Sequence, residues 1–201
     1  GTGNTIAFSS TNSNERAVIK LNGADYITFD SLTIDSRGAG TFGYGVQLIN
    51  NADTNTVRKS TILVSETSTS ANFAGIVINA VAAGTIGLGN TWCDGNKFDN
   101  NTISGGFYGA TLVGSSTQLI TSNSFTNNSF TNFYNYGLYV AGTTNTLIEG
   151  NTFSRPTRAL VTSGYGIFLT QAPSNGMVIS KNKITNLFGG LPTSTLPSYG
   201  I

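Results

Sequence analysis

Short runs in which apolar and polar residues alternate recur along the whole chain, and they predict strands rather than helices. The clearest runs have an aromatic or small residue, then glycine, then two apolar residues separated by one position. They occupy residues 44–48, 74–78, 108–112, 136–140 and 165–169, and residues 199–201 begin a further copy. Their glycines stand 28 to 34 residues apart. Such a period predicts a repeat architecture with one structural unit per period.

A second signature follows each of these strands: an apolar residue, two residues, Asn, one residue, then Ile or Phe. It occurs at 98–103, 120–125, 148–153 and 179–184, at 57–62 with Ser60 in place of Asn, and at 29–34 with Leu32. The copy at 120–125 is ambiguous because residues 125–130 fit the pattern one strand later. An amide both donates and accepts hydrogen bonds. We therefore expect Asn101, Asn123, Asn151 and Asn182 to form a ladder at a corner of the fold.

The strands are short and the turns between them are too long for two-residue hairpins, so each strand should stack in parallel on its equivalent in the next period. In the strand 165–169, we expect Ile167 and Leu169 to point inward. Gly166 should serve a corner with positive φ or a close backbone approach. The tyrosines that precede the glycines should stack along the axis with their hydroxyls reaching water. A longer spacing marks an insertion at about 80–96, which contains Trp92 and Cys93.

The repeated Gly-Ile-x-Leu and Asn-Thr-Phe/Ile segments resemble the right-handed parallel β-helix repeat of pectate-lyase-like enzymes and of large secreted bacterial surface or adhesin proteins. Residues 19–29 are similar to β-helix regions in long secreted surface proteins of gliding and biofilm-forming bacteria. The resemblance implies an all-β solenoid of about six to seven coils. It also implies a secreted or cell-surface location. One domain, 1–201, should be a segment of a longer helix. Because lyases, hydrolases, adhesins and tailspikes share this fold, the resemblance does not select a function.

Composition excludes several partners. Of the 201 residues 9% are charged and the net charge is +1, so no basic surface is expected that could neutralise several phosphates of a nucleic acid. No apolar run reaches the roughly 20 residues of a membrane span. The single cysteine, Cys93, is expected to be a small buried apolar residue. The chain shows neither an initiator Met nor a signal peptide, and we expect it to be a processed piece of a longer protein.

Catalytic candidates are few. Nine acidic residues are present, most of them in predicted turns, where Asp commonly bonds to nearby backbone. Asp94 and Asp99, beside the insertion and Lys97, are the one acidic pair that we would inspect for catalysis. Arg155 and Arg158 have only Glu149 as an acidic neighbour in the sequence. The chain contains no histidine, so the usual general base and imidazole metal ligands are missing. We expect no cofactor, no metal and no catalysis by this segment.

Binding has a better candidate. Between the two inward positions of each glycine-containing strand, one residue should face solvent. These residues are Gln47, Val77, Thr111, Tyr139 and Phe168. The last two, near Phe133, Tyr134 and Tyr136, would form an aromatic surface on which sugar rings could stack, unless a loop or a neighbouring domain covers it. We take Tyr139, Phe168 and Tyr134 as candidate ligand-binding residues for a polysaccharide or a cell-surface glycan.

The sequence therefore favours a structural or adhesive β-helix that binds glycans. One alternative is a fragment of a polysaccharide lyase or glycoside hydrolase whose catalytic coils lie partly outside residues 1–201. Another is a stalk or filament that self-associates through exposed strand edges.

Overall fold

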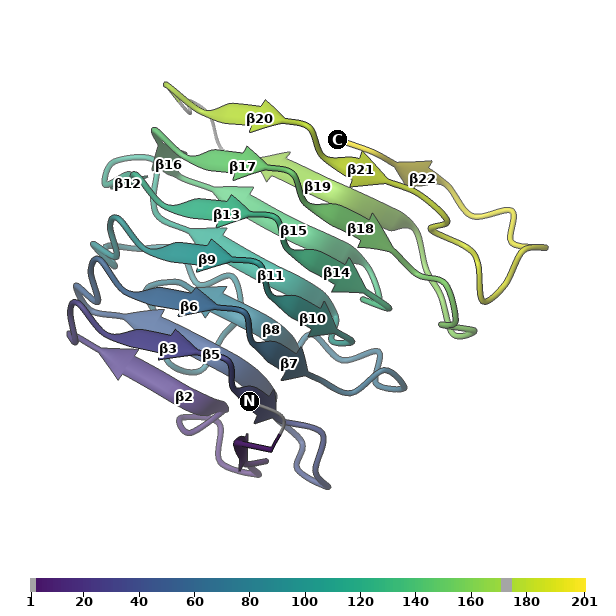
Figure 1. Cartoon of the computed structure of the whole chain (residues 1–201), viewed down its shortest axis with the longest axis horizontal. Coiled ribbons are helices and arrows are strands. Elements are labelled where there is room, and N and C mark those ends of the chain that lie inside the picture. The colour runs from purple at the N-terminus through teal and green to yellow at the C-terminus, as the bar shows by residue number, and fades with distance from the viewer. Residues whose placement is uncertain (1–2, 171–174) are drawn as a thin grey trace.

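The structure, a computed structural model, describes residues 3–170 and 175–201 and consists of three parallel sheets wrapped around one axis (Figure 1). Sheet 1 contains, in spatial order, β2 (Ala17–Asn22), β5 (Gly43–Ile49), β8 (Phe73–Ile78), β11 (Tyr108–Val113), β15 (Tyr136–Ala141), β19 (Gly164–Thr170) and β22 (Ser198–Tyr199). Sheet 2 contains β3 (Thr28–Asp30), β6 (Thr56–Arg58), β9 (Lys97–Asp99), β13 (Ser124–Thr126), β17 (Leu147–Glu149) and β20 (Val178–Ser180). Sheet 3 contains β1 (Thr5–Ala7), β4 (Thr33–Asp35), β7 (Thr61–Leu63), β10 (Thr102–Ser104), β14 (Ser129–Thr131), β18 (Thr152–Ser154) and β21 (Lys183–Ile184).

Each coil of the chain passes through sheets 1, 2 and 3 in that order, and then climbs to the next coil. Every strand pairs in parallel with its equivalent one coil away, as β5 does with β8 and β8 with β11. A small additional sheet pairs β12 (Ile120–Thr121) with β16 (Thr143–Thr144). This arrangement confirms the right-handed parallel β-helix that the repeat predicts. In Figure 1 the coils rise from the purple N-terminal end to the yellow C-terminal end.

The corner between sheets 2 and 3 is one residue with positive φ followed by one residue that points inward. The positive-φ residues are Ser31, Lys59, Asn100, Asn127, Gly150 and Lys181, with φ between 48° and 70°. The inward residues that follow them are Leu32, Ser60, Asn101, Asn128, Asn151 and Asn182. A single left-handed residue turns the chain sharply, and it leaves the backbone groups beside it without strand partners.

The inward asparagines at this corner supply the missing partners. The Asn128 Oδ1 atom accepts the Asn101 N–H at 2.9 Å, and the Asn151 Oδ1 atom accepts the Asn128 N–H at 2.9 Å. Each Nδ2 atom also donates to the next Oδ1 atom and to a carbonyl of the coil below, as Asn128 does to Phe98. The predicted asparagine ladder is therefore present, and it ends at Asn182.

One member of the predicted ladder is wrong. Asn128, the second choice in the ambiguous copy, occupies the position between Asn101 and Asn151, and Asn123 does not. Asn123 belongs to a second ladder, at the corner that enters sheet 2. There its Oδ1 atom accepts the Asn96 N–H at 3.0 Å, and Asn96 likewise accepts from Asn55 at 2.9 Å. The coil contains two corners with the same local sequence, which is why one pattern fitted both.

The repeated glycines of sheet 1 are explained by close packing. None of Gly45, Gly75, Gly109, Gly137 and Gly166 has positive φ, so the corner explanation is wrong and the close-approach explanation is confirmed. A Cβ atom on Gly137 would lie 2.5 Å from the Gly166 carbonyl oxygen and 2.5 Å from the Phe153 ring. The strand pairs skip the glycine, as in Tyr136↔Tyr165 and Leu138↔Ile167. Gly137 therefore leaves room for the Phe153 ring of sheet 3.

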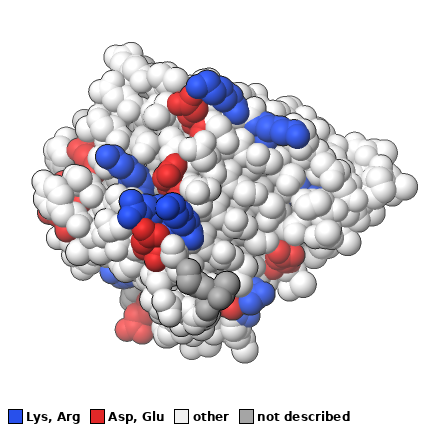
Figure 2. Space-filling model, viewed as in Figure 1, with Lys and Arg blue, Asp and Glu red and all other residues white. Residues whose placement is uncertain are grey.

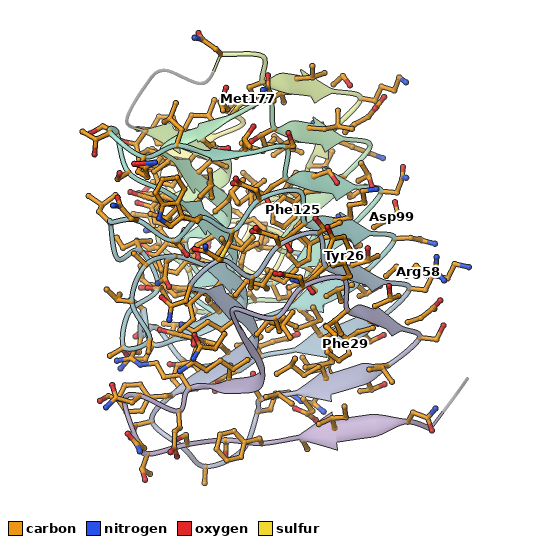
Figure 3. The ribbon with its side chains drawn as sticks, turned by 90° about the vertical axis from the view of Figure 1, so that its left-hand side faces the viewer. Tyr26, Phe29, Arg58, Asp99, Phe125 and Met177 are labelled. Atoms are coloured by element: carbon orange, nitrogen blue, oxygen red, sulfur yellow. The ribbon has the colours of Figure 1, made fainter. Side chains whose placement is uncertain are left out.

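Side chains from all three sheets fill the interior (Figure 3), where Phe29, Phe125 and Met177 lie at successive heights. The Phe98 and Phe125 rings stack with centroids 4.7 Å apart, and the Phe130 and Phe153 rings do so at 4.8 Å. Ile167 is buried, as expected. Leu169 is in register with buried Val140 but is 41% exposed, since β22 pairs only with Gly164 and Tyr165 of its strand.

Replacing Asn128 by Ala tests the ladder. The change removes both bonds that its Oδ1 atom accepts and both that its Nδ2 atom donates, and it leaves buried backbone groups without partners. We expect the free energy of unfolding in urea to fall by about 3 kcal/mol or more. Ser129→Ala, at the neighbouring outward position, is the matched control and should change it by less than about 1 kcal/mol. Equal losses in both variants would contradict a special role for the ladder.

Candidate functional site

The outer face of sheet 1 carries a second apolar cluster, separate from the interior. It is built around Tyr44, Ala74, Val77 and Tyr108, with Tyr136 and Tyr139 packed against it. The tyrosines before the glycines stack as predicted, with ring centroids 5.3 Å apart for Tyr108–Tyr136, 5.0 Å for Tyr136–Tyr165 and 4.8 Å for Tyr165–Tyr199. We call this row the tyrosine column. It forms because one strand residue per coil points outward at the strand spacing.

Tyr139 and Phe168 lie across the tyrosine column. The Tyr139 ring is nearly perpendicular to the rings of Tyr108 and Tyr136, at 84° and 89°. Because Tyr108 and Tyr136 stack face to face, it is their edges that meet one face of Tyr139. The Phe168 ring lies 5.3 Å from the Tyr139 ring at 31°. Both residues are half-buried, so the two adjacent rings are partly open to solvent.

Tyr134 lies beside this surface and is linked to it through another aromatic residue. Its ring contacts Phe107 at 5.5 Å, and Phe107 in turn contacts Tyr136 at 6.1 Å. The three predicted ligand-binding residues therefore lie on one aromatic surface, which we call the aromatic platform: Phe107, Tyr134, Tyr136, Tyr139, Tyr165 and Phe168. Phe133, which we expected near this surface, is fully buried in the core and is not part of it.

The other three outward residues were expected to be exposed, and this prediction is wrong. Gln47, Val77 and Thr111 are each 0% exposed because the insertion between β8 and β9 packs over them. The Gln47 side chain donates to the carbonyls of Val81 and Ala82, both at 3.3 Å. The Thr111 hydroxyl donates to the Thr85 carbonyl at 2.9 Å. The insertion thus covers one half of the outward row and leaves the aromatic half open.

The tyrosine hydroxyls do not all reach water. Tyr44 is fully buried, and its hydroxyl accepts a hydrogen bond from Arg16 at 3.0 Å. Tyr108 is only 5% exposed, and burial raises the pKa of its hydroxyl to about 12. Tyr136 and Tyr165 are half-buried, and Tyr199 is exposed. The hydroxyls therefore become more accessible toward the C-terminal coils.

Arg155 and Arg158 are buried and held by main-chain oxygens. Arg155 donates to the carbonyls of Tyr134 and Thr162, and its guanidinium lies 4.7 Å from the Phe188 ring centroid. Burial lowers its pKa to about 10, and the neighbouring Arg158 adds to the effect. Arg158 lies 5.1 Å from the Tyr134 ring and donates to the Asn132 carbonyl. Both guanidinium groups therefore donate to main-chain carbonyls of the protein, and these bonds hold the loop that carries Tyr134.

The structure does not bring Asp94 and Asp99 together. Asp94 precedes the corner before β9 and accepts the Thr121 N–H at 2.7 Å, while Asp99 is the last residue of β9. Burial raises the pKa of Asp94, and Asp53 contributes to the rise. The Asp99 carboxylate accepts from the Thr126 hydroxyl at 2.6 Å. Both aspartates accept hydrogen bonds from the next coil, rather than from backbone in their own turn as expected.

Charges are few and paired on the face that sheets 2 and 3 present (Figure 2), where red and blue atoms lie next to each other. Arg58 contacts Asp30 at 2.7 Å and Lys181 contacts Glu149 at 2.6 Å. Figure 3 shows Arg58 and Asp99 at the periphery of the coils. On sheet 1 the strands contain a single charged residue, Lys20 of β2. The strands that carry Tyr139 and Phe168 therefore contain no charged residue, whereas Arg158 lies beside the Tyr134 ring.

In residues 3–170 and 175–201, no three His, Cys, Asp or Glu side chains gather in a way that could hold a metal ion. Nor does the described chain contain a helix that is long and apolar enough to cross a bilayer. Cys93 is fully buried, as predicted, and burial raises the pKa of its thiol.

Comparison with known proteins gave one family. A family profile described as "Periplasmic copper-binding protein (NosD)" matches residues 26–195, which is most of the chain. A search of curated proteins and a search of solved structures each returned no match.

The donor set of this chain does not fit a copper site. Proteins hold copper mainly through thiolate, thioether and imidazole groups. The chain has no His, one Cys and one Met. Cys93 is buried beside Thr91, before β9, whereas Met177 packs against the core at the start of β20, three strands further along sheet 2. The two sulfur atoms cannot share one ion.

The tyrosine column predicts sensitivity to alkali. The folded state holds the Tyr108 proton up to a pKa of about 12, whereas the unfolded chain releases it near 10, so stability is lost as the pH rises through this range. We expect the urea midpoint to fall between neutral pH and about pH 11, and to fall less in Tyr108→Phe. Tyrosinate absorbance should also rise in two phases, with buried tyrosines ionising later. A single phase at the ordinary tyrosine pKa would contradict the described burial.

Proposed function

The chain belongs to the NosD family, described as periplasmic, and we propose that it is a structural and adhesive β-helix outside the cytoplasm that binds neutral glycans on its aromatic platform. The observation that carries this proposal is the pair of adjacent, half-buried rings Tyr139 and Phe168, whose centroids are 5.3 Å apart and whose strands contain no charged residue. Pyranose rings have apolar C–H faces that pack on aromatic rings, and their hydroxyls remain hydrated around the rim.

The rigidity of the platform also supports binding. Tyr139 rests on the edges of Tyr108 and Tyr136, and Phe168 contacts Tyr136 and Tyr165 at 5.2 and 5.3 Å. Each ring is therefore held before a ligand arrives. A surface that is already ordered loses little conformational entropy on binding, so more of the contact energy appears as affinity.

Copper is not part of this proposal, although the description of the family names it. With a single buried thiol and a single distant thioether, the chain should show no tight stoichiometric copper site. We expect a competition titration of Cu(I) against a high-affinity chelator to leave the metal on the chelator. Transfer of one equivalent to the protein would overturn this expectation, and loss of that transfer in Cys93→Ser would assign the ligand.

Removing both platform rings tests glycan binding. Each stacked ring is worth about 1 kcal/mol, so Tyr139→Ala with Phe168→Ala should weaken the retention of neutral polysaccharides in affinity electrophoresis about tenfold or more. Tyr26→Ala is the matched control, because Tyr26 is a 79% exposed aromatic residue before β3, away from sheet 1.

Two results would contradict the proposal. Unchanged retention in the double variant would remove the platform as the binding site. Release of reducing sugars or unsaturated products from any polysaccharide would replace the adhesive role by a hydrolase or a lyase.

A further inference from the structure

The row of outward residues on sheet 1 continues beyond the aromatic platform. Gln47, Val77, Thr111, Tyr139 and Phe168 are consecutive strand partners, so they form one straight line across five coils. Tyr139 and Phe168 end the line on the open side. The first three lie under residues 80–90 of the insertion, which we call the cover loop. What lies beneath this loop is therefore the direct extension of the platform.

The cover loop is attached by few bonds. Three side chains donate hydrogen bonds to its carbonyls. Gln47 and Thr111 belong to the row, and Asn79, which immediately follows β8, donates to the Gly84 carbonyl. Within residues 80–90, one main-chain hydrogen bond is described, from the Ala80 N–H to the Gly87 carbonyl at 3.2 Å. The loop also exposes apolar side chains, 40% for Val81 and Ile86 and 53% for Leu88. Segments with so few internal bonds open at lower free energy than paired strands do.

Two acceptors under the cover loop have no partner. Gln47 and Asn79 are both fully buried, yet the Gln47 Oε1 and Asn79 Oδ1 atoms make no hydrogen bond. Their orientation is fixed, because the Nε2 and Nδ2 atoms face carbonyl oxygens, which only accept. Turning either amide around would place oxygen against oxygen. An unpaired buried acceptor disfavours the closed loop. A ligand that donates a hydrogen bond to this acceptor would remove that cost.

We propose that the cover loop is a displaceable lid over a polar extension of the glycan site. A glycan longer than the platform moves the loop aside and lies along Gln47, Val77 and Thr111. Its hydroxyl groups donate to the Gln47 and Asn79 amide oxygens. Short glycans occupy only Tyr139 and Phe168 and leave the lid closed. This inference rests on the proposed function, because it names the ligand length and the subsites of the same site.

Thr85 marks where lid and platform meet. The Thr85 carbonyl accepts from the Thr111 hydroxyl at 2.9 Å, and Thr111 is the strand partner of Tyr139. Tyr108 is the lid-side neighbour of the Tyr136 ring in the tyrosine column. A sugar bound on Tyr139 is therefore one strand away from the edge of the lid, so a chain that grows in that direction meets Thr85 first.

Hydrogen exchange tests the lid without a ligand. Amides in residues 80–90 should exchange by local opening, at least tenfold faster than those of β8 and β11 beneath them. Thr111→Val, which removes one lid bond and keeps the strand, should raise exchange in 80–90 alone. If these amides exchange only as fast as the global unfolding of the protein allows, the lid is overturned.

Oligosaccharide length tests the subsites. Cellobiose and cellohexaose, with maltose and maltohexaose in parallel, would be titrated by calorimetry into the wild type, into Thr111→Val, and into a variant with residues 81–88 replaced by a short Gly-Ser linker. We expect the linker variant to bind the hexasaccharide about tenfold more tightly than the wild type does, with the disaccharide unchanged. Thr111→Val should shift the hexasaccharide in the same direction by a smaller factor. Gln47→Ala in the linker background should weaken the hexasaccharide only.

The outcomes separate the two ideas. Equal binding of short and long saccharides by all variants overturns the lid and leaves the platform in place as a glycan site. No binding of either length by any variant overturns both. If the linker variant does not fold, the Thr111→Val comparison and the exchange measurement decide.

Discussion

The hydrogen bond from one coil's backbone to the next coil's asparagine is the interaction on which this fold depends. At each corner into sheets 2 and 3, a left-handed residue turns the chain and leaves an N–H that no strand can pair. At most of these corners a buried Asn Oδ1 atom from the next coil accepts it, as Asn128 accepts from Asn101, and at Leu32 the Ser60 hydroxyl does so. The bond links a corner to its equivalent and to no other position, because the amide is held on its second side by a carbonyl of the preceding coil. These bonds hold neighbouring coils in register at the corners into sheets 2 and 3. The strands of sheet 1 then pair in the same register.

A fixed register is what turns single outward residues into surfaces. The tyrosine column exists because the tyrosines of neighbouring strands lie directly over one another. Tyr139 and Phe168 are adjacent because β15 and β19 pair in register. Gly137 contributes from the inside, since the ring of Phe153 occupies the space where a Cβ would be. A shift of one residue between these strands would turn the platform residues into the core. The binding surface is therefore a consequence of the corner bonds rather than a separate device.

The sequence predicts the periodic part of this structure well, because period and corner chemistry are local. Parallel stacking, the inward Ile167 and the asparagine ladder all follow from spacing and residue type. The choice between Asn123 and Asn128 does not, since both corners of a coil have the same local pattern and only the stacking partner tells them apart. Nor could Gln47, Val77 and Thr111 be recognised as buried. What covers them is the insertion at 80–96, whose carbonyls are held by the distant side chains of Gln47 and Thr111 and whose path follows from no repeat.

The insertion also shows how such a helix can vary its function without changing its frame. The connection between β8 and β9 contains 18 residues, 79–96. The Asn55 N–H nevertheless donates to the Asn96 Oδ1 atom, as in the other neighbouring coils. Loop length is thus uncoupled from register, since the corners on either side restore the stack whatever the loop does. In the outward row, the aromatic residues Tyr139 and Phe168 are open to solvent, and the loop covers Gln47, Val77 and Thr111. The path of the loop therefore determines which part of the row meets the solvent. A family can therefore keep the coil and lose or gain a ligand by changing a single insertion.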